Sequence, residues 1–153
     1  MNSLIQTRID FTGKEEGVIV AVGGMTGGFT MFIKNRRLYY DYNFLDGVHY
    51  ILKSTRLPKG AVDLKFNFIK TKEFGGTGEL FVNDKKVDTV EMPQMHISTY
   101  SLAETFDVGR DTGTQVSKLY DGPFPFNGKL DRVLIRISDS NVVPARKMPT
   151  YNY

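Results

Sequence analysis

Alternation of polar and apolar side chains with a period of two is the feature that most constrains how this chain can fold. In the segment 61–69 the apolar side chains fall at every second position, and Asp63, Lys65 and Asn67 lie between them. Because successive side chains of a β-strand point to opposite faces, this pattern predicts a strand that is buried on one face. Residues 37–44 alternate in the same way and are rich in aromatic side chains, which favours a strand there too.

Short segments of this kind recur along the whole chain. The predicted strands are 5–11, 17–22, 28–34, 37–44, 48–54, 61–69, 78–83, 85–90, 106–108 and 132–137. The segment 17–22 is apolar on both faces, so we expect a central strand. Turn-forming pairs such as Gly-Gly, Asp-Gly and Asn-Asp separate the strands, and no stretch shows the apolar period of a helix. This organisation predicts an all-β fold, with two antiparallel sheets in a jelly-roll arrangement.

The length of 153 residues fits one globular domain. We expect a single β-sandwich domain over residues 1–138 and a C-terminal tail over 139–153 that is partly mobile. Between residues 91 and 126 alternating runs are few and polar groups many, which indicates long ordered loops around the short strand 106–108.

Composition excludes several kinds of chemistry and partner. The chain has no cysteine, so it forms no disulfide, thiolate zinc site, iron–sulfur cluster or cysteine nucleophile. A net charge of +3 is too small to indicate a nucleic-acid partner, and no apolar run is long enough to predict a membrane span. Of the two histidines, His49 alternates with Val48 and Tyr50 and is predicted to face solvent, so a catalytic metal cluster is not supported.

Carboxylates gather around residues 104–111. Glu104 and Asp107 form the best local pair for glycosidase chemistry, but a spacing of three puts them on opposite faces of a strand, which argues against that role. Asp107 and Asp111 flank Gly109 and could help to bind calcium. The alternative is that these aspartates hydrogen-bond their own backbone in turns. Arg110 has two interpretations as well: it contacts a ligand, or it pairs with one of the neighbouring carboxylates and locks the loop.

Two tyrosines are candidates for stacking on sugar rings. Tyr39 lies on the polar face of its predicted strand, and Tyr120 lies in the irregular region. A binding platform built from either would need the ring to be exposed.

Several separated motifs carry a family resemblance. They are Glu-Thr-Phe-Asp-Val-Gly-Arg-Asp-Thr-Gly-Thr at 104–114, Val-Ser at 116–117, Tyr120, Pro-Phe-Pro-Phe-Asn-Gly at 123–128, Gly-Val-Ile-Val-Ala at 17–21, Gly-Gly at 23–24, Tyr40 and Asn-Phe at 43–44. In this order they resemble the C-terminal accessory region of bacterial arylsulfatases, a module similar to concanavalin A-like and laminin-G-like sandwiches. The resemblance runs from about residue 17 to residue 137. It implies a concanavalin A-like jelly roll and a parent enzyme that hydrolyses sulfate esters.

The resemblance does not imply that this chain is a catalyst. Sulfatases use a formylglycine made from the first residue of a Cys/Ser-x-Pro-x-Arg motif, and the only local echo is Val-Val-Pro-Ala-Arg at 142–146. Val142 has no heteroatom with which to attack sulfur. We therefore expect no catalytic residue in this chain. We also expect no cofactor or metal ligand, apart from the calcium that Asp107 and Asp111 could help to bind.

Two functions follow as expectations. In the first, the domain is non-catalytic and packs on a sulfatase catalytic domain, and the parent is periplasmic or secreted if it is a typical exported sulfatase. The candidate interface or binding residues lie in the loops 104–121: Glu104, Asp107, Arg110, Asp111, Tyr120 and Asp121. In the second, the domain is a stand-alone lectin-like module that binds a glycan, for example a sulfated one, through Arg110, Lys118 and Tyr120.

Overall fold

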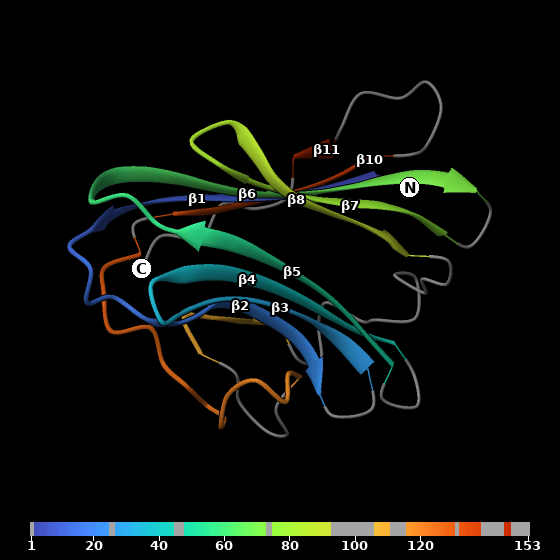
Figure 1. Cartoon of the computed structure of the whole chain (residues 1–153). Coiled ribbons are helices and arrows are strands. Elements are labelled where there is room, and N and C mark those ends of the chain that lie inside the picture. The colour runs from blue at the N-terminus through green and yellow to red at the C-terminus, as the bar shows by residue number, and fades with distance from the viewer. Residues whose placement is uncertain are drawn as a thin grey trace.

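The computed structural model consists of two antiparallel β-sheets stacked face to face (Figure 1). It describes residues 2–24, 27–44, 48–72, 75–92, 106–110, 116–130, 132–138 and 146–147. No helix occurs in these ranges, and so none that is long and apolar enough to cross a membrane.

Six strands form one sheet and five form the other. The six-stranded sheet has the order β11 (Arg146–Lys147), β10 (Val133–Ser138), β1 (Asn2–Phe11), β6 (Gly60–Lys72), β7 (Gly75–Val82) and β8 (Lys85–Met92). The five-stranded sheet has the order β5 (Val48–Arg56), β4 (Arg37–Phe44), β3 (Gly27–Lys34), β2 (Gly17–Gly24) and β9 (Phe106–Val108).

The connections between the strands define the topology. Strands β2 to β5 follow one another as neighbours in one sheet, and β6 to β8 do so in the other. Strand β1 lies between β6 and β10, so Ile5 is opposite Phe66 on one side and opposite Ile135 on the other. All the named strand pairs are antiparallel. The predicted all-β fold class, a sandwich of two antiparallel sheets, is confirmed.

Tight turns between neighbouring strands match local sequence signals. The two-residue connection between β3 and β4 has Asn35 and Arg36 at φ values of 51° and 63°, and Asn83 and Asp84 between β7 and β8 have 52° and 63°. Two successive positive φ values are the conformation of a type I′ hairpin, for which asparagine in the first position is well suited. These turns fix the register of both hairpins.

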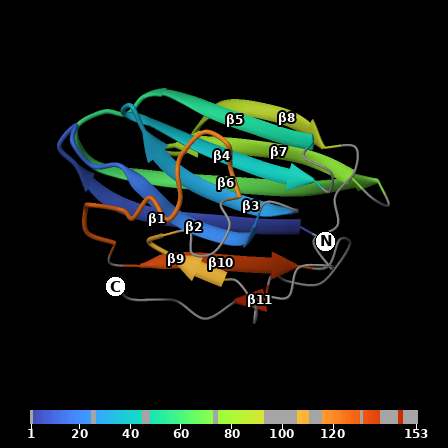
Figure 2. The same cartoon turned by 90° about the horizontal axis from the view of Figure 1, so that it is seen from below.

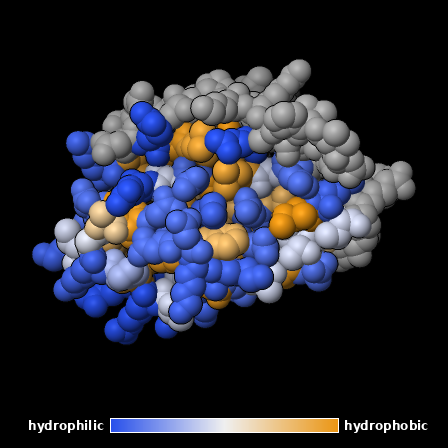
Figure 3. Space-filling model, turned by 90° about the horizontal axis from the view of Figure 1, so that it is seen from above, coloured by the Kyte–Doolittle hydropathy of each residue, from blue (hydrophilic) through white to orange (hydrophobic). Residues whose placement is uncertain are grey.

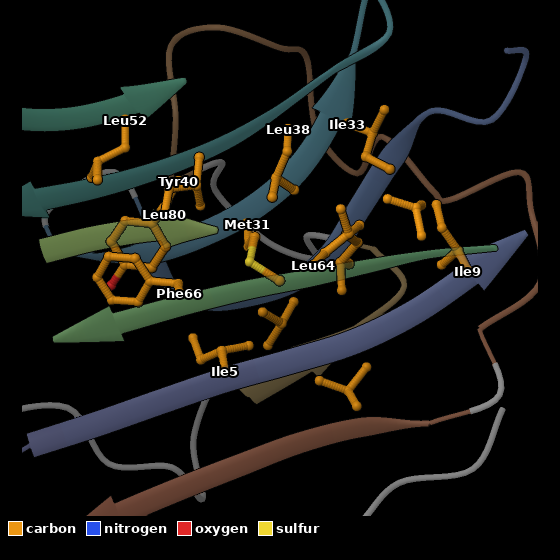
Figure 4. Packing of buried hydrophobic residues seen from close by; sticks show 14 of the residues in the cluster. Ile5, Ile9, Met31, Ile33, Leu38, Tyr40, Leu52, Leu64, Phe66 and Leu80 are labelled. Carbon is orange, nitrogen blue, oxygen red and sulfur yellow. The ribbon is translucent and has the colours of Figure 1, made fainter. Parts of the chain in front are cut away.

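The core fills the space between the sheets with side chains from their inner faces. Residues of β1 and β6 meet residues of β3, β4 and β5 there, as Figure 4 shows for Ile5, Leu64 and Leu52. Tyr40 of the five-stranded sheet stacks on Phe66 of the six-stranded sheet, with ring centroids 3.5 Å apart and planes 5° from parallel. Burial of this apolar surface is the main stabilising contribution to the fold.

The strands predicted from alternation are all present, with boundaries that differ by a few residues. The structure adds β11, which lies within the expected C-terminal tail and pairs with Arg136 and Ile137 of β10. A two-residue strand has too few positions to show alternation, so the sequence pattern offers no signal for it.

Candidate functional site

Residues 116–126, here called the covering segment, lie across the outer face of the five-stranded sheet (Figure 2). The ring of Tyr120 packs edge-on against Phe32 at a centroid distance of 4.9 Å, and its hydroxyl donates a hydrogen bond to Oγ1 of Thr30 at 3.2 Å. The residues that form this second apolar cluster are Val18, Ala21, Phe32, Val116 and Tyr120, with Tyr39, Leu119 and Phe124 at its margin. The sheet therefore has apolar packing on both faces, which explains why the sequence of β2 does not alternate.

Backbone hydrogen bonds anchor the end of the covering segment to β2. Val18 N–H donates to the carbonyl of Phe124 at 2.9 Å. Gly109, which follows β9, links β2 to the covering segment. Its N–H donates to the carbonyl of Ile19 and its carbonyl accepts from Phe126 N–H, each at 2.8 Å. These contacts join three segments that are far apart in the sequence.

The approach of the chain at Gly17 is too close for any other residue. A Cβ atom there would lie 2.3 Å from the carbonyl oxygen of Pro125, and the φ of Gly17 is +123°. Next to it, Glu16 and Asn127 exchange hydrogen bonds, since Glu16 N–H donates to Asn127 Oδ1 at 2.9 Å and Asn127 N–H donates to the Glu16 carbonyl at 3.0 Å. Several of the residues that carry the family resemblance thus have a structural role.

A carboxyl group is buried on the same outer face. Asp41 of β4 is fully buried, and its Oδ1 lies 2.7 Å from Nδ1 of His49 on β5. The side chain of His49 is only 12% exposed. His49 does lie on the face opposite Tyr50 and Leu52, but the prediction that it faces solvent is wrong, because on that face it packs beside Asp41.

Burial raises the pKa of Asp41, because desolvation disfavours the charged carboxylate. Ser117 of the covering segment and His49 act in the opposite direction and lower the pKa of this carboxyl, without cancelling the effect of burial. The second oxygen of Asp41, Oδ2, has no hydrogen-bond partner of normal geometry among the described residues. The group is held at an energetic cost that the surrounding packing must offset.

The order of these three groups does not suit nucleophilic catalysis. In a catalytic triad the imidazole lies between the hydroxyl and the carboxylate, so that it can take the proton of the nucleophile. Here the carboxyl of Asp41 interacts with both His49 and Ser117, and Ser117 is completely buried. We infer a structural polar link between β4, β5 and the covering segment. Within the ranges that the structure describes, no group of three or more His, Asp or Glu side chains could hold a metal ion.

The sequence-predicted site residues differ in where they lie. Arg110 is exposed directly after β9, and Asp121 is exposed on the covering segment. Tyr120 is only 4% exposed, so the prediction that its ring forms a sugar-stacking platform is wrong; the ring is used to pack on Phe32 and Phe124. Tyr39, the other tyrosine considered, is half-buried and stacks on Phe32 at 5.0 Å.

Three of the candidate carboxylates cannot be placed. Glu104, Asp111 and the side chain of Asp107 lie outside the described residues, and so does the tail segment 142–145. The calcium hypothesis and the pairing of Arg110 with a neighbouring carboxylate therefore stay predictions.

Sequence reasoning missed the buried pair of Asp41 and His49. A signal for it exists, because Asp41 is the only charged residue among the aromatic residues of 38–44 and lies on the same face as Tyr39. The antiparallel pairing of β4 with β5 puts Asn43 opposite His49 and Asp41 opposite Ile51, so the aspartate and the histidine are diagonal neighbours on one face.

Fold and site together define an antiparallel β-sandwich in which the chain covers part of the outer face of its own five-stranded sheet. No protein-family model and no curated protein matches the sequence. Among solved structures, the chain is similar to an endo-1,3-beta-glucanase from Streptomyces sioyaensis, with 10% sequence identity and a TM-score of 0.42. The match covers 64% of this chain and 46% of the glucanase chain, so the chain spans less than half the length of that structure.

Proposed function

We propose that this chain is a non-catalytic β-sandwich module that packs on, and supports, the catalytic domain of a sulfatase. The observation that carries the proposal is the fold of the segment 116–121, which contains part of the family resemblance. Its inward side chains are used within the domain, at Val116, Ser117 and Tyr120, while Lys118 and Asp121 project outward. An ordered segment with polar residues facing outward is suited to contact with another domain.

The absence of an accessible reactive group in the described part of the covered face supports a non-catalytic role. Asp41 and Ser117 are both fully buried there. Asp41 lies between Ser117 and His49, so the imidazole is not placed between hydroxyl and carboxylate as it is in a catalytic triad.

The chemistry of the outward residues fits an interface between domains of one protein. Arg110, Lys118 and Asp121 are exposed and combine both signs of charge. Interfaces between domains are more polar than permanent subunit interfaces, so exposed ionic groups of this kind are compatible with one. Arg110 is the strongest candidate contact, because its planar guanidinium can bind a carboxylate with two hydrogen bonds.

The proposal is tested first by the reading frame that encodes the chain. A Cys/Ser-x-Pro-x-Arg motif in the same frame is expected. In the protein that contains it, Arg110→Ala with Lys118→Ala should lower the hydrolysis of an aryl sulfate ester or the melting temperature of the catalytic domain. Arg56→Ala with Lys85→Ala is the matched control, because both residues are exposed and neither lies on the covering segment. A frame without the motif, or equal activity and melting of the two variants, contradicts the proposal.

A carbohydrate-binding function is the second candidate. The sequence-based form of this function relied on stacking by the ring of Tyr120, but that ring is buried. A groove on the outer face of the opposite sheet supports it, through residues outside the covering segment.

A further inference from the structure

The outer face of the six-stranded sheet contains a groove with a volume of about 450 Å³. Figure 3 shows this face, on which hydrophilic residues predominate around smaller hydrophobic areas. The groove lies over β1, next to β6 on one side and the chain before β10 on the other. Its charged lining residues are Arg8, Asp10, Asp63, Lys129 and Arg132, and its apolar ones are Ile9 and Leu134.

The groove exists because β10 is shorter than β1. Strand β10 pairs with β1 from Asn2 to Thr7, whereas β6 pairs with it as far as Phe11. At the end of the pairing between β1 and β10, Thr7 Oγ1 donates a hydrogen bond to the carbonyl of Arg132 at 2.5 Å. Beyond Thr7, β10 does not pair with β1, so residues 8–10 of β1 form the floor of the groove where they no longer have β10 beside them.

The charges in the groove are incompletely paired. Asp63 accepts two hydrogen bonds from Nε2 of Gln6, at 3.1 and 3.0 Å. Among the described residues, no carboxylate lies within 4 Å of the guanidinium groups of Arg8 or Arg132. Three cationic side chains and two carboxylates line the groove, so its formal charge is +3 − 2 = +1. The groove therefore offers guanidinium donors together with carboxylate acceptors.

We propose that this groove binds an anionic sugar unit, one that bears a sulfate or a carboxylate group. Arg8 and Arg132 would hold the anionic group, because guanidinium forks match the oxygen geometry of both groups. Asp10 and Asp63 would accept hydrogen bonds from sugar hydroxyls, and Leu134, which is partly exposed, would contact the C–H face of the ring. The volume lies within the range of about 300–1,000 Å³ that is usual for small-molecule sites. The site does not depend on the sulfatase proposal.

Calorimetric titration of the full chain tests this site with three probes. They are a sulfated chondroitin tetrasaccharide, a trigalacturonate and neutral cellotriose. We expect one or both anionic probes to bind with a dissociation constant in the order of 0.1–1 mM, and cellotriose to bind at least about tenfold more weakly. The two anionic probes distinguish a sulfate from a carboxylate as the preferred group.

The decisive variant is Arg8→Gln with Arg132→Gln, in which both exposed guanidinium groups of the groove are removed. Affinity for the anionic probe should fall about tenfold or more. The matched control is Arg36→Gln with Arg56→Gln, which removes the same charge at exposed positions in the β3–β4 turn and in β5 and should leave the affinity within about twofold.

Backbone amide shifts of the unmodified chain provide a readout that does not depend on a variant. Addition of the anionic probe should move the resonances of residues 6–10 and 132–134. The proposal is overturned if neither anionic probe binds, if cellotriose binds equally well, if both double variants lose affinity equally, or if the shifts occur elsewhere.

Discussion

Replacement of Gly17 by alanine should separate the covering segment from the sheet. Two costs add at this position. An alanine at a φ of +123° costs about 1–2 kcal/mol in backbone strain. The new Cβ would lie 2.3 Å from the Pro125 carbonyl oxygen and 2.5 Å from Cα of Phe126, so backbone must move, which costs about 1–3 kcal/mol more.

The chain offers a matched control at Gly60. Its φ of +108° imposes a comparable backbone strain, but a Cβ there has no atom within 4 Å. Gly60→Ala should therefore cost about 1–2 kcal/mol and Gly17→Ala about 2–5 kcal/mol. The reduced entropy of the unfolded chain affects both variants alike and cancels in the comparison.

Thermal unfolding and hydrogen exchange give the two readouts. At about 2–4 °C per kcal/mol, Gly17→Ala should lower the melting temperature by about 4–20 °C and Gly60→Ala by about 2–8 °C. The amides of Val18 and Phe126, which donate to the carbonyls of Phe124 and Gly109 next to the contact, should exchange faster only in Gly17→Ala. If Gly17→Ala costs no more than Gly60→Ala, or if those amides keep their protection, the close approach does not hold the segment.

Three further predictions concern buried groups. Burial raises the pKa of Asp41 above 3.8 in the folded state, so the contribution of this carboxyl to stability is greatest below that pH and is lost as the pH rises through the folded pKa. Asp41→Asn should therefore gain stability relative to wild type between pH 4 and pH 7. A pH-independent difference in the free energy of unfolding between the two proteins would contradict this. Tyr120→Phe should cost about 1 kcal/mol in urea unfolding through loss of the bond to Thr30, with the near-ultraviolet spectrum otherwise kept; no loss would mean that the hydroxyl is not needed. Leu64→Ala should cost about 2–5 kcal/mol in the same assay, because Leu64 is fully buried between the sheets, and a cost below 1 kcal/mol would show that the core collapses around the gap.

Local periodicity was enough to predict the strands of the two sheets. It did not predict that the covering segment packs on the outer face of the five-stranded sheet. Alternation in 61–69 is a property of neighbouring residues, so it identifies β6 and its buried face directly. The covering segment depends on contacts such as that of Tyr120 with Thr30, which are 90 positions apart in the sequence. No short window of sequence contains that information.

The same limit explains the error at His49. Alternation correctly assigned its side chain to the face opposite Tyr50 and Leu52. Whether that face meets water depends on Asp41 beside it and on Ser117 of the covering segment above the carboxyl. The exposure of Tyr120 was misjudged for the same reason, since a loop residue was treated as a surface residue.

The central place of β1 has a consequence during protein synthesis. Asn2 pairs with Ser138 and Thr7 with Val133, so one side of β1 waits for residues that are synthesised more than 120 positions later. At about 5–20 residues per second, this interval is roughly 7–27 s. During that time β1 can pair only with β6, and its other edge is open to strands of other nascent chains. The exposed charged residues of β1, Arg8 and Asp10, disfavour association through that edge.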